Sequence, residues 1–261
     1  IAEDECGAPE FYMHGAKLAL VHGAHGRMDP AALEAAIVKA KGSGVHGVQA
    51  AAVSITNVTE AGTVHSVAEV AALAGVARAH GLPVHLDGAR FANALVALGC
   101  TPAEMTWKSG VDVVSFGGTK NGCMAVEAVI FFDPAKAWEF ELRRKRGAHL
   151  FSKHRYLSAQ MAGYLADDLW QDMARSANAA CARLTAGLLA NGAEMIHTPD
   201  ANMIFTRFPR AVHQKLQAAG AKYYVLNGDA ANGPADEMLA ARLVCDWSMT
   251  DALVDQFLTH F

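Results

Sequence analysis

Short apolar runs alternate with amphipathic segments through the first half of the chain. The apolar runs predict strands at residues 16–21, 47–55, 83–87, 111–116 and 126–132. Between them, apolar residues recur every three or four positions, and these segments predict helices from residue 30 onward, at 66–80 and at 91–98. Alternation of this kind predicts βα units and a mostly parallel sheet.

Signals for helix ends support this interpretation. Asp29 and Pro30 are the residue types that favour the N-cap and the first helical position. Ser66 and Glu69 have the spacing of a capping box, and Gly81 stands where a helix can end on a glycine. These signals predict two helices with well-defined ends.

After Asp133 and Pro134 the pattern changes from alternation to a run of amphipathic segments. These predict helices at residues 135–146, 153–174, 177–190 and 250–261, and strands at 203–208, 223–226 and 242–245. We expect these elements to form a smaller α+β domain. The predicted boundary lies near residue 155, with a large domain at residues 1–155 and a small domain at 156–261.

Composition narrows the class of protein. Hydrophobic residues make up 52% of the chain and charged residues 18%, which is typical of a well-buried α/β protein. The formal net charge of −4 gives no reason to expect a nucleic-acid partner. No apolar run approaches the ~18 residues of a membrane span, so we expect no membrane association. The five cysteines lack CxxC or metal-ligand spacing, and we expect reduced thiols in a cytoplasmic protein.

Two polar residues stand where predicted strands end. Asp87 closes the strand at 83–87, and Lys120 follows the strand at 111–116 after two glycines and a threonine. In open α/β sheets, sites form outside the carboxyl ends of the strands. A carboxylate and an amine at that edge suit pyridoxal phosphate (PLP), which needs a lysine for its Schiff base and an acid for its pyridine nitrogen. The alternative is a helix-capping aspartate and a solvated lysine.

Residues 85–94 (HLDGARFANA) and 115–122 (SFGGTKNG) resemble the two signature segments of the threonine aldolases, and more narrowly of the bacterial low-specificity L-threonine aldolases. Residues 4–10, 56–64 and 241–247 are similar to further segments of that family. The resemblance implies a fold-type I PLP-dependent enzyme, with a large domain on a mostly parallel sheet and a smaller C-terminal α+β domain. It also implies retro-aldol cleavage of L-threonine, L-allo-threonine and related β-hydroxy-α-amino acids to glycine and an aldehyde.

The site residues of that family match positions of this chain. By resemblance, Lys120 is the Schiff-base lysine and Asp87 the partner of the pyridinium nitrogen, and these two are the catalytic residues. Arg90 and Arg242 match the two arginines that bind the substrate carboxylate, a task suited to a planar bidentate guanidinium. The resemblance implies this cofactor-binding set: Lys120, Asp87, Arg90, Thr119, Thr59, Arg155 and Lys145.

Several roles stay open at this point. The resemblance implies that Arg155 and Lys145 reach the cofactor phosphate of a neighbouring subunit, yet a solvated basic helix end explains the same charges. Some relatives have a histidine where this chain has Thr59, so the base that accepts the β-hydroxyl proton is not identified. We expect His85 to be a core histidine. The twelve histidines form no HExxH pair, and we expect no catalytic metal.

The resemblance also bears on assembly and completeness. It implies a homo-oligomer, a dimer of dimers with active sites shared between subunits. Family members continue upstream of Ile1 with a phosphate-binding turn and a histidine that stacks on the cofactor ring, so we expect that an N-terminal segment is missing. The alternatives to a threonine aldolase are another fold-type I PLP lyase, such as a phenylserine aldolase or a β-eliminating lyase, and a non-catalytic fragment.

Overall fold

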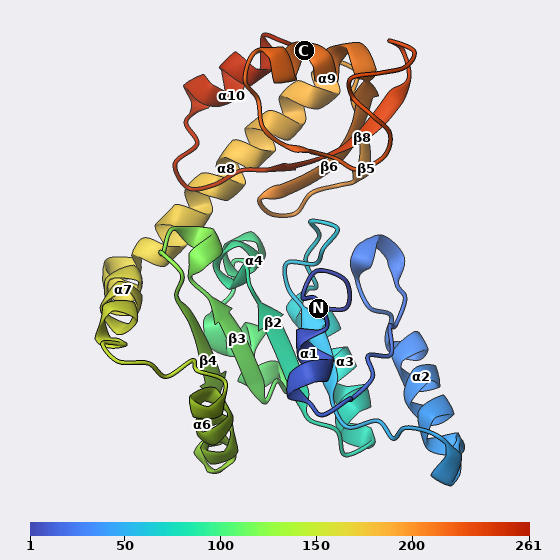
Figure 1. Cartoon of the computed structure of the whole chain (residues 1–261), viewed down its shortest axis with the longest axis vertical. Helices are drawn as coiled ribbons and strands as arrows, with labels where there is room; N and C mark the ends of the chain where they lie inside the picture. Colours follow the sequence, from blue (N-terminus) through green and yellow to red (C-terminus); the bar gives the residue numbers. More distant parts are fainter.

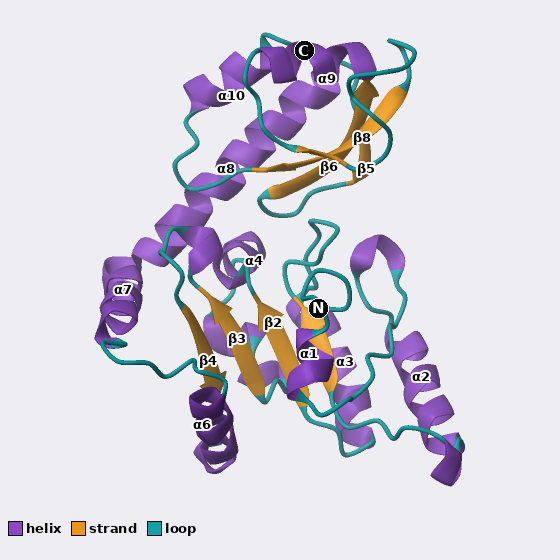
Figure 2. Cartoon of the chain, in the orientation of Figure 1, coloured by secondary structure: helices purple, strands orange, loops and turns teal.

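The chain folds into two lobes connected by one long helix, α8 (Leu169–Ala190) (Figure 1). The structure is a computed structural model, and it describes residues 1–261. The larger lobe contains the elements that precede α8, and the smaller lobe contains those that follow it (Figure 2). The chain therefore has the α/β large unit and smaller α+β unit that the sequence pattern predicts.

The larger lobe is built on a four-stranded sheet. Its strands are β1 (Val53–Thr56), β2 (Val84–Gly88), β3 (Val113–Gly117) and β4 (Glu127–Phe131), which lie side by side in that order. Strands β1, β2 and β3 run parallel, and β4 runs antiparallel to β3. Because the parallel strands end at the same edge, the residues that follow them meet there. That edge faces the smaller lobe (Figure 2).

Helices surround this sheet. They are α1 (Ala8–Tyr12), α2 (Pro30–Gly42), α3 (Val67–Ala79), α4 (Phe91–Leu98), α5 (Pro102–Met105), α6 (Ala137–Arg146) and α7 (Arg155–Leu165). Short 3-10 turns are η1 (Ala24–Gly26), η2 (Gly44–His46), η3 (Trp107–Ser109), η4 (Thr119–Asn121), η5 (Pro134–Lys136) and η6 (Ala166–Asp168).

The predicted helix caps are confirmed. The Asp29 carboxylate accepts a hydrogen bond from the Ala32 backbone N–H at 2.8 Å. Ser66 and Glu69 form both hydrogen bonds of a capping box at the start of α3. Just beyond α3, Gly81 has a φ of 71°, a left-handed conformation that glycine adopts without strain.

The smaller lobe combines a second sheet with three helices. The strands are β5 (Glu194–His197), β6 (Met203–Pro209), β7 (Tyr224–Val225) and β8 (Met238–Val244), in the order β5-β6-β8-β7 and antiparallel throughout. Helix α10 (Asp251–Leu258) packs against α8, and α9 (Arg210–Ala218) packs against β6. A bidentate ion pair between Arg183 and Asp255 joins α8 to α10.

Helix α8 belongs to both hydrophobic cores. Trp170 and Ala174, near its start, pack into the core of the larger lobe. Leu184 and Leu188, near its end, pack into the core of the smaller lobe. The transition from the core of the larger lobe to that of the smaller lobe therefore lies inside α8. This position is C-terminal to the domain boundary that we expect near residue 155.

Several predicted elements are wrong or have different ends. Residues 16–21 form no strand, and only the last part of the predicted strand at 47–55 forms β1. These apolar runs have no neighbouring strand to pair with, and an unpaired strand leaves its backbone groups unsatisfied. The predicted helix at 153–174 breaks at Asp167 and Asp168, both at positive φ, and α8 then continues through the gap expected at 174–177.

No helix is both long enough and apolar enough to cross a membrane.

We predict that Leu73→Ala lowers the free energy of unfolding by about 2–5 kcal/mol, because Leu73 on α3 is fully buried and its removal leaves a cavity. Urea denaturation of the two proteins measures the change. Leu253→Ala on α10 is the matched control, since that side chain is 50% exposed and its loss should change stability much less. Equal losses for the two variants would contradict the assigned core.

Candidate active site

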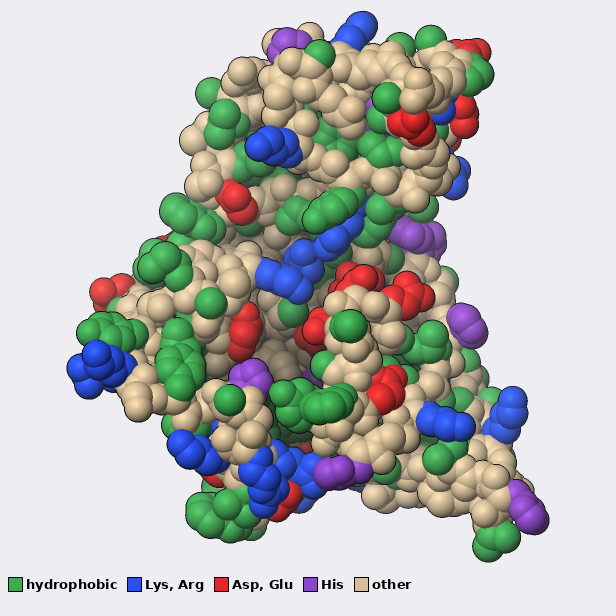
Figure 3. Space-filling view, viewed as in Figure 1, with side chains coloured by type: hydrophobic (Ala, Val, Ile, Leu, Met, Phe, Trp, Pro, Cys, Tyr) green, Lys and Arg blue, Asp and Glu red, His purple; other side chains and the backbone are tan.

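The candidate site lies at the waist of the molecule, where the carboxyl ends of β1, β2 and β3 face the smaller lobe. The surface is hollowed there, and Lys, Arg, Asp and Glu side chains gather around the hollow (Figure 3). Three segments border this edge of the larger lobe: the loop after β1, the turn after β2 and the turn after β3. In the smaller lobe, strand β6 begins and strand β8 ends nearby.

Asp87 stands near the end of β2, the middle of the three parallel strands. It pairs in register with Thr56 on β1 and with Ser115 on β3. One carboxylate oxygen accepts the backbone N–H of Ala89 at 3.0 Å, which fixes the side chain at the start of the turn. The carboxylate is therefore held at the centre of the sheet edge, as the sequence predicts.

His85 lies two residues before Asp87 and supports it from within the sheet. Its two ring nitrogens lie 2.8 Å from the Ser54 hydroxyl on β1 and 2.8 Å from the Ser115 hydroxyl on β3. Burial lowers the pKa of His85, and the nearby Asp87 carboxylate raises it by a smaller amount. The ring thus links three strands as a neutral group, which agrees with the core role expected for it.

Lys120 lies in the turn η4, which begins directly after β3. A Cβ on Gly117 would stand 2.3 Å from the Ala89 carbonyl oxygen, so this turn packs against the turn after Asp87 with no space for a side chain. The neighbouring Asn121 side chain is buried and donates to the Tyr164 hydroxyl at 2.6 Å and to the Trp170 carbonyl at 2.8 Å. Lys120 is itself exposed, on an anchored turn next to that of Asp87.

Two arginines approach the same place from opposite lobes. Arg90 follows β2, is only 7% exposed, and its buried Nε atom has no hydrogen-bond partner. Burial lowers the pKa of Arg90, the positive charge of Arg242 lowers it further, and the carboxylates of Glu60 and Asp87 raise it. Arg242 extends from β8, and its Nε donates to the Met203 sulfur at 3.2 Å. Two cations held close together at a half-closed cleft form a site for an anion.

The two threonines of the predicted set, Thr59 and Thr119, form hydrogen bonds with residues close to them in the sequence. The Thr59 hydroxyl is buried, lies 2.8 Å from the Thr63 hydroxyl and accepts the N–H groups of Ala61 and Thr63. The Thr119 hydroxyl donates to the Val126 carbonyl at 3.3 Å, and the N–H groups of Gly118 and Thr119 donate to the Glu127 carboxylate. Both threonines border the site and shape the turns around it.

Lys145 and Arg155 lie apart from these residues. Lys145, on α6, donates to the Leu150 carbonyl at 3.2 Å. Arg155 begins α7 and stacks on the ring of Tyr156, with 5.4 Å from guanidinium carbon to ring centroid. Both are exposed, and no hydrogen bond or ion pair joins either one to Asp87, Lys120 or Arg90. The structure therefore brings six predicted residues to one cleft (Asp87, Lys120, Arg90, Arg242, Thr59 and Thr119) and leaves these two at a separate surface.

Sequence reasoning missed three residues that organise this cleft. Asn121 anchors the turn of Lys120. The Glu127 carboxylate accepts the N–H groups of Gly118 and Thr119, just before Lys120. The Asp200 carboxylate accepts the Val64 N–H in the loop after β1. Asn121 directly follows Lys120 in a glycine-rich segment, and that position is a weak signal. Nothing in the local sequence around Asp200 points to a partner 136 positions away.

The fold and the cleft define a two-lobed α/β protein with two arginines at the cleft between its lobes, and comparisons with known proteins narrow this class. The profile of the Beta-eliminating lyase family matches residues 1–210. The low specificity L-threonine aldolase of Pseudomonas aeruginosa is 39% identical over 249 residues, which cover 95% of this chain and 68% of that protein. The enzyme of the same name from a Pseudomonas species is 38% identical, covering 97% of this chain and 70% of that protein.

Solved structures agree with these sequence relatives. The threonine aldolase of Leishmania major superposes with a TM-score of 0.85 at 25% identity, covering 95% of this chain and 70% of that one. A putative L-allo-threonine aldolase from Listeria monocytogenes has the same fold, with a TM-score of 0.71 at 16% identity, over 98% of this chain and 70% of that one. The chain belongs to the Beta-eliminating lyase family and, within it, to the low-specificity L-threonine aldolases. The family and fold class expected from the sequence motifs are confirmed.

We predict that the free energy of unfolding falls as the pH drops below 6.5, and that His85→Gln makes this fall smaller. The pKa of folded His85 lies below its ordinary value of 6.5, so the unfolded chain binds the proton more readily. The contribution is fully present above pH 6.5 and is lost as the pH falls toward the folded pKa, at up to about 1.4 kcal/mol per pH unit. Urea denaturation at pH 7.5 and 5.5 measures it. His46→Gln, at an exposed histidine, should keep the wild-type pH dependence; an unchanged dependence in His85→Gln would refute the prediction.

Proposed function

We propose that this protein cleaves L-threonine, L-allo-threonine and related β-hydroxy-α-amino acids to glycine and an aldehyde, in a PLP-dependent retro-aldol reaction. The observation that carries the proposal is the pair of opposed arginines, Arg90 with its unpaired Nε and Arg242, beside Asp87 and Lys120. This arrangement can bind an amino-acid carboxylate next to a carboxylate and a primary amine.

The residues present fit PLP. Lys120 supplies an exposed amine on a fixed turn, and Asp87 supplies a carboxylate at the sheet edge to pair with the pyridine nitrogen. Gly117 packs on the Ala89 backbone and Gly118 on the Val126 carbonyl, so the turn of Lys120 is held closely between the turn of Asp87 and the start of β4. PLP, when bound, forms a covalent link to an amine and draws electrons away from the substrate Cα.

The chain itself would orient the substrate. A planar guanidinium on each side of the carboxylate fixes both its position and its plane. We propose that Arg90 and Arg242 would in this way help to select which bond of the substrate breaks, by restricting its orientation in the cleft.

The remaining members of the predicted set complete the proposal. Thr119 and Thr59 would contact the cofactor from the two turns that they stabilise. Lys145 and Arg155 lie exposed at a separate surface, which suits a role at the cofactor phosphate of a neighbouring subunit in a homo-oligomer, a dimer of dimers. All five cysteines are free thiols, in agreement with a cytoplasmic location.

A second candidate is β-elimination by the same site, which the description of the matching family favours. The two reactions share the lysine, the aspartate and the carboxylate clamp, and they differ in the bond that breaks. Retro-aldol cleavage releases glycine and an aldehyde, whereas β-elimination releases a keto acid and ammonia. Product analysis with L-threonine, phenylserine and L-serine separates threonine aldolase, phenylserine aldolase and β-eliminating lyase.

We predict that borohydride reduction of the PLP-loaded full-length protein fixes a pyridoxyl group on Lys120, as shown by peptide mapping, and that Lys120→Ala abolishes both the label and glycine production. The reason is that Lys120 is the amine next to Asp87 in the cleft. Lys108→Ala, at an exposed lysine of η3, should keep both. A label on another lysine would refute the assigned site, and no binding of PLP would favour a non-catalytic fragment.

We predict that Arg242→Lys raises the KM for L-threonine by about 10- to 100-fold with a smaller change in kcat. An ammonium cannot form the bidentate bond, and the loss of a hydrogen bond to a charged group is worth about 1.5–3 kcal/mol. Initial-rate kinetics of glycine production measures the change. Arg207→Lys on β6, an exposed arginine of the same sheet, is the matched control. A wild-type KM in Arg242→Lys would show that this arginine does not bind the carboxylate.

A further inference from the structure

The loop of residues 57–66, between β1 and α3, is a segment of the larger lobe that contacts the smaller lobe; we call it the clasp loop. At its start, the Asn57 N–H donates to the Asp87 carbonyl at 2.9 Å. The Asn57 side chain bonds to both backbone groups of His65, at 3.0 and 3.1 Å, and so closes the loop across its base. At its end, the capping box of Ser66 starts α3. The loop is therefore rigid and is fixed at its base to the Asp87 strand.

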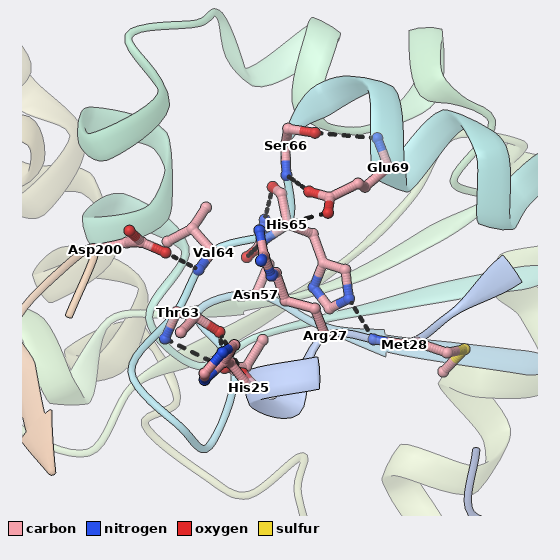
Figure 4. Close-up of polar contacts among 11 residues, drawn as sticks. His25, Arg27, Met28, Asn57, Thr63, Val64, His65, Ser66, Glu69 and Asp200 are labelled. Carbon is pink, nitrogen blue, oxygen red and sulfur yellow. Dashed lines mark hydrogen bonds and ion pairs between the residues drawn. The ribbon is translucent and has the colours of Figure 1, made fainter. Parts of the chain in front are cut away.

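The tip of the clasp loop bonds to a single residue of the smaller lobe, Asp200. The Asp200 N–H donates to the Gly62 carbonyl at 3.0 Å, and the Val64 N–H donates to the Asp200 carboxylate at 2.9 Å (Figure 4). Beside these bonds, a Cβ on Gly62 would stand 2.4 Å from the Met203 carbonyl oxygen, and Gly62 has a φ of 78°. Backbone thus packs on backbone at this contact, with Asp200 bonded to the backbone on both sides of Thr63.

A neighbouring contact reinforces this one. The Thr63 hydroxyl donates to the His25 carbonyl at 2.7 Å, and the His25 ring nitrogen Nδ1 lies 3.0 Å from Nδ1 of His197 at the end of β5. The clasp loop, the segment around His25 and the smaller lobe therefore meet at one place (Figure 4). Both histidines are accessible to solvent, whereas Val64 is buried.

On the side of the smaller lobe, the contact leads directly to Arg242. Met203 follows Asp200 by three residues and begins β6, and its sulfur accepts the Arg242 Nε–H at 3.2 Å. Strand β6 also pairs with β8, with Phe205 opposite Arg242. A short path therefore runs from Asp87 through the hydrogen bonds of the clasp loop to Asp200, and then along three residues of chain to Met203 and its hydrogen bond with Arg242.

We propose that Asp200 is a positioning residue that sets the separation of Arg90 and Arg242, and so the affinity for the substrate carboxylate; this rests on the proposed function, in which those two arginines bind that group. Asp200 touches neither substrate nor cofactor. It acts by accepting the Val64 N–H, which is buried and has no other acceptor. Without that acceptor the buried N–H is unpaired, and the two lobes can separate at the clasp loop.

The sensitivity of binding to this separation follows from geometry. Two guanidiniums bind one carboxylate bidentately only within a narrow range of distances, and a displacement of about 1 Å at such a clamp can cost on the order of 100-fold. The carboxylate is bound in the same way before and during reaction, so the loss should appear mainly in KM and less in kcat. Loss of a residue that only stabilised the fold would not raise KM while leaving kcat nearly unchanged.

The test compares Asp200→Ala with Asp200→Asn in the PLP-loaded full-length protein. Asp200→Ala should raise the KM for L-threonine about tenfold or more and change kcat less than about threefold. Asp200→Asn keeps an oxygen acceptor for the Val64 N–H and should stay within about threefold of wild type in both constants. Asp236→Ala, at an exposed aspartate elsewhere in the smaller lobe, is the matched control and should match wild type.

Hydrogen–deuterium exchange gives a readout that does not depend on activity. The amides of residues 59–64 should exchange about tenfold or more faster in Asp200→Ala than in wild type, and near the wild-type rate in Asp200→Asn. Gly62→Ala should also speed this exchange, because its Cβ would displace Met203 without changing any charge.

The outcomes separate the proposal from the function on which it rests. An unchanged KM in Asp200→Ala would overturn the positioning role, and so would an Asp200→Asn variant as impaired as Asp200→Ala. If the wild-type protein cleaves no β-hydroxy-α-amino acid, the proposed function fails and the positioning role falls with it. The exchange measurement then still decides whether Asp200 holds the clasp loop.

Discussion

The close contact of Gly117 with the Ala89 carbonyl is the constraint on which the site depends. Strands β2 and β3 are parallel neighbours, so the turns that follow them leave the sheet side by side. A side chain at residue 117 would force these turns apart, since its Cβ would stand 2.3 Å from the carbonyl oxygen. With glycine there, the turn of Lys120 rests on the turn of Asp87. Backbone packing therefore brings together the two turns that carry the amine and the carboxylate.

The second half of the site depends on how the two lobes are held together. Helix α8 is a continuous link whose two ends are buried in different cores, and this fixes the lobes on one side. On the other side, the clasp loop meets Asp200 and Gly62 packs on Met203. Two connections far apart in space restrict the rotation of one lobe relative to the other far better than a single connection does. Arg242 therefore reaches the cleft from a defined direction, although it lies on β8 of the smaller lobe and not on the sheet that carries Asp87.

Local signals explain which parts of this architecture could be predicted from the sequence. The strands before Asp87 and Lys120 and the capping box at Ser66 are encoded by residues near them in the chain, and they were predicted correctly. The apolar run at 16–21 was misread because a strand requires a partner, which is a property of the whole fold. The hydrogen bond between Asp200 and Val64 and the burial of Arg90 are also properties of the whole fold. Both features depend on how the two lobes pack together, so the residues near them in the sequence do not predict them.

The burial of Arg90 is the least favourable feature of this cleft. A buried guanidinium loses hydration, and its Nε has no acceptor within the chain. Burial is the main cause of the lowered pKa of Arg90, the positive charge of Arg242 lowers it further, and the carboxylates of Glu60 and Asp87 raise it. In the function that we propose, a ligand carboxylate between the two arginines would supply the missing acceptor and offset the repulsion between them. Recognition of an amino-acid α-carboxylate would then follow from the burial of one side chain.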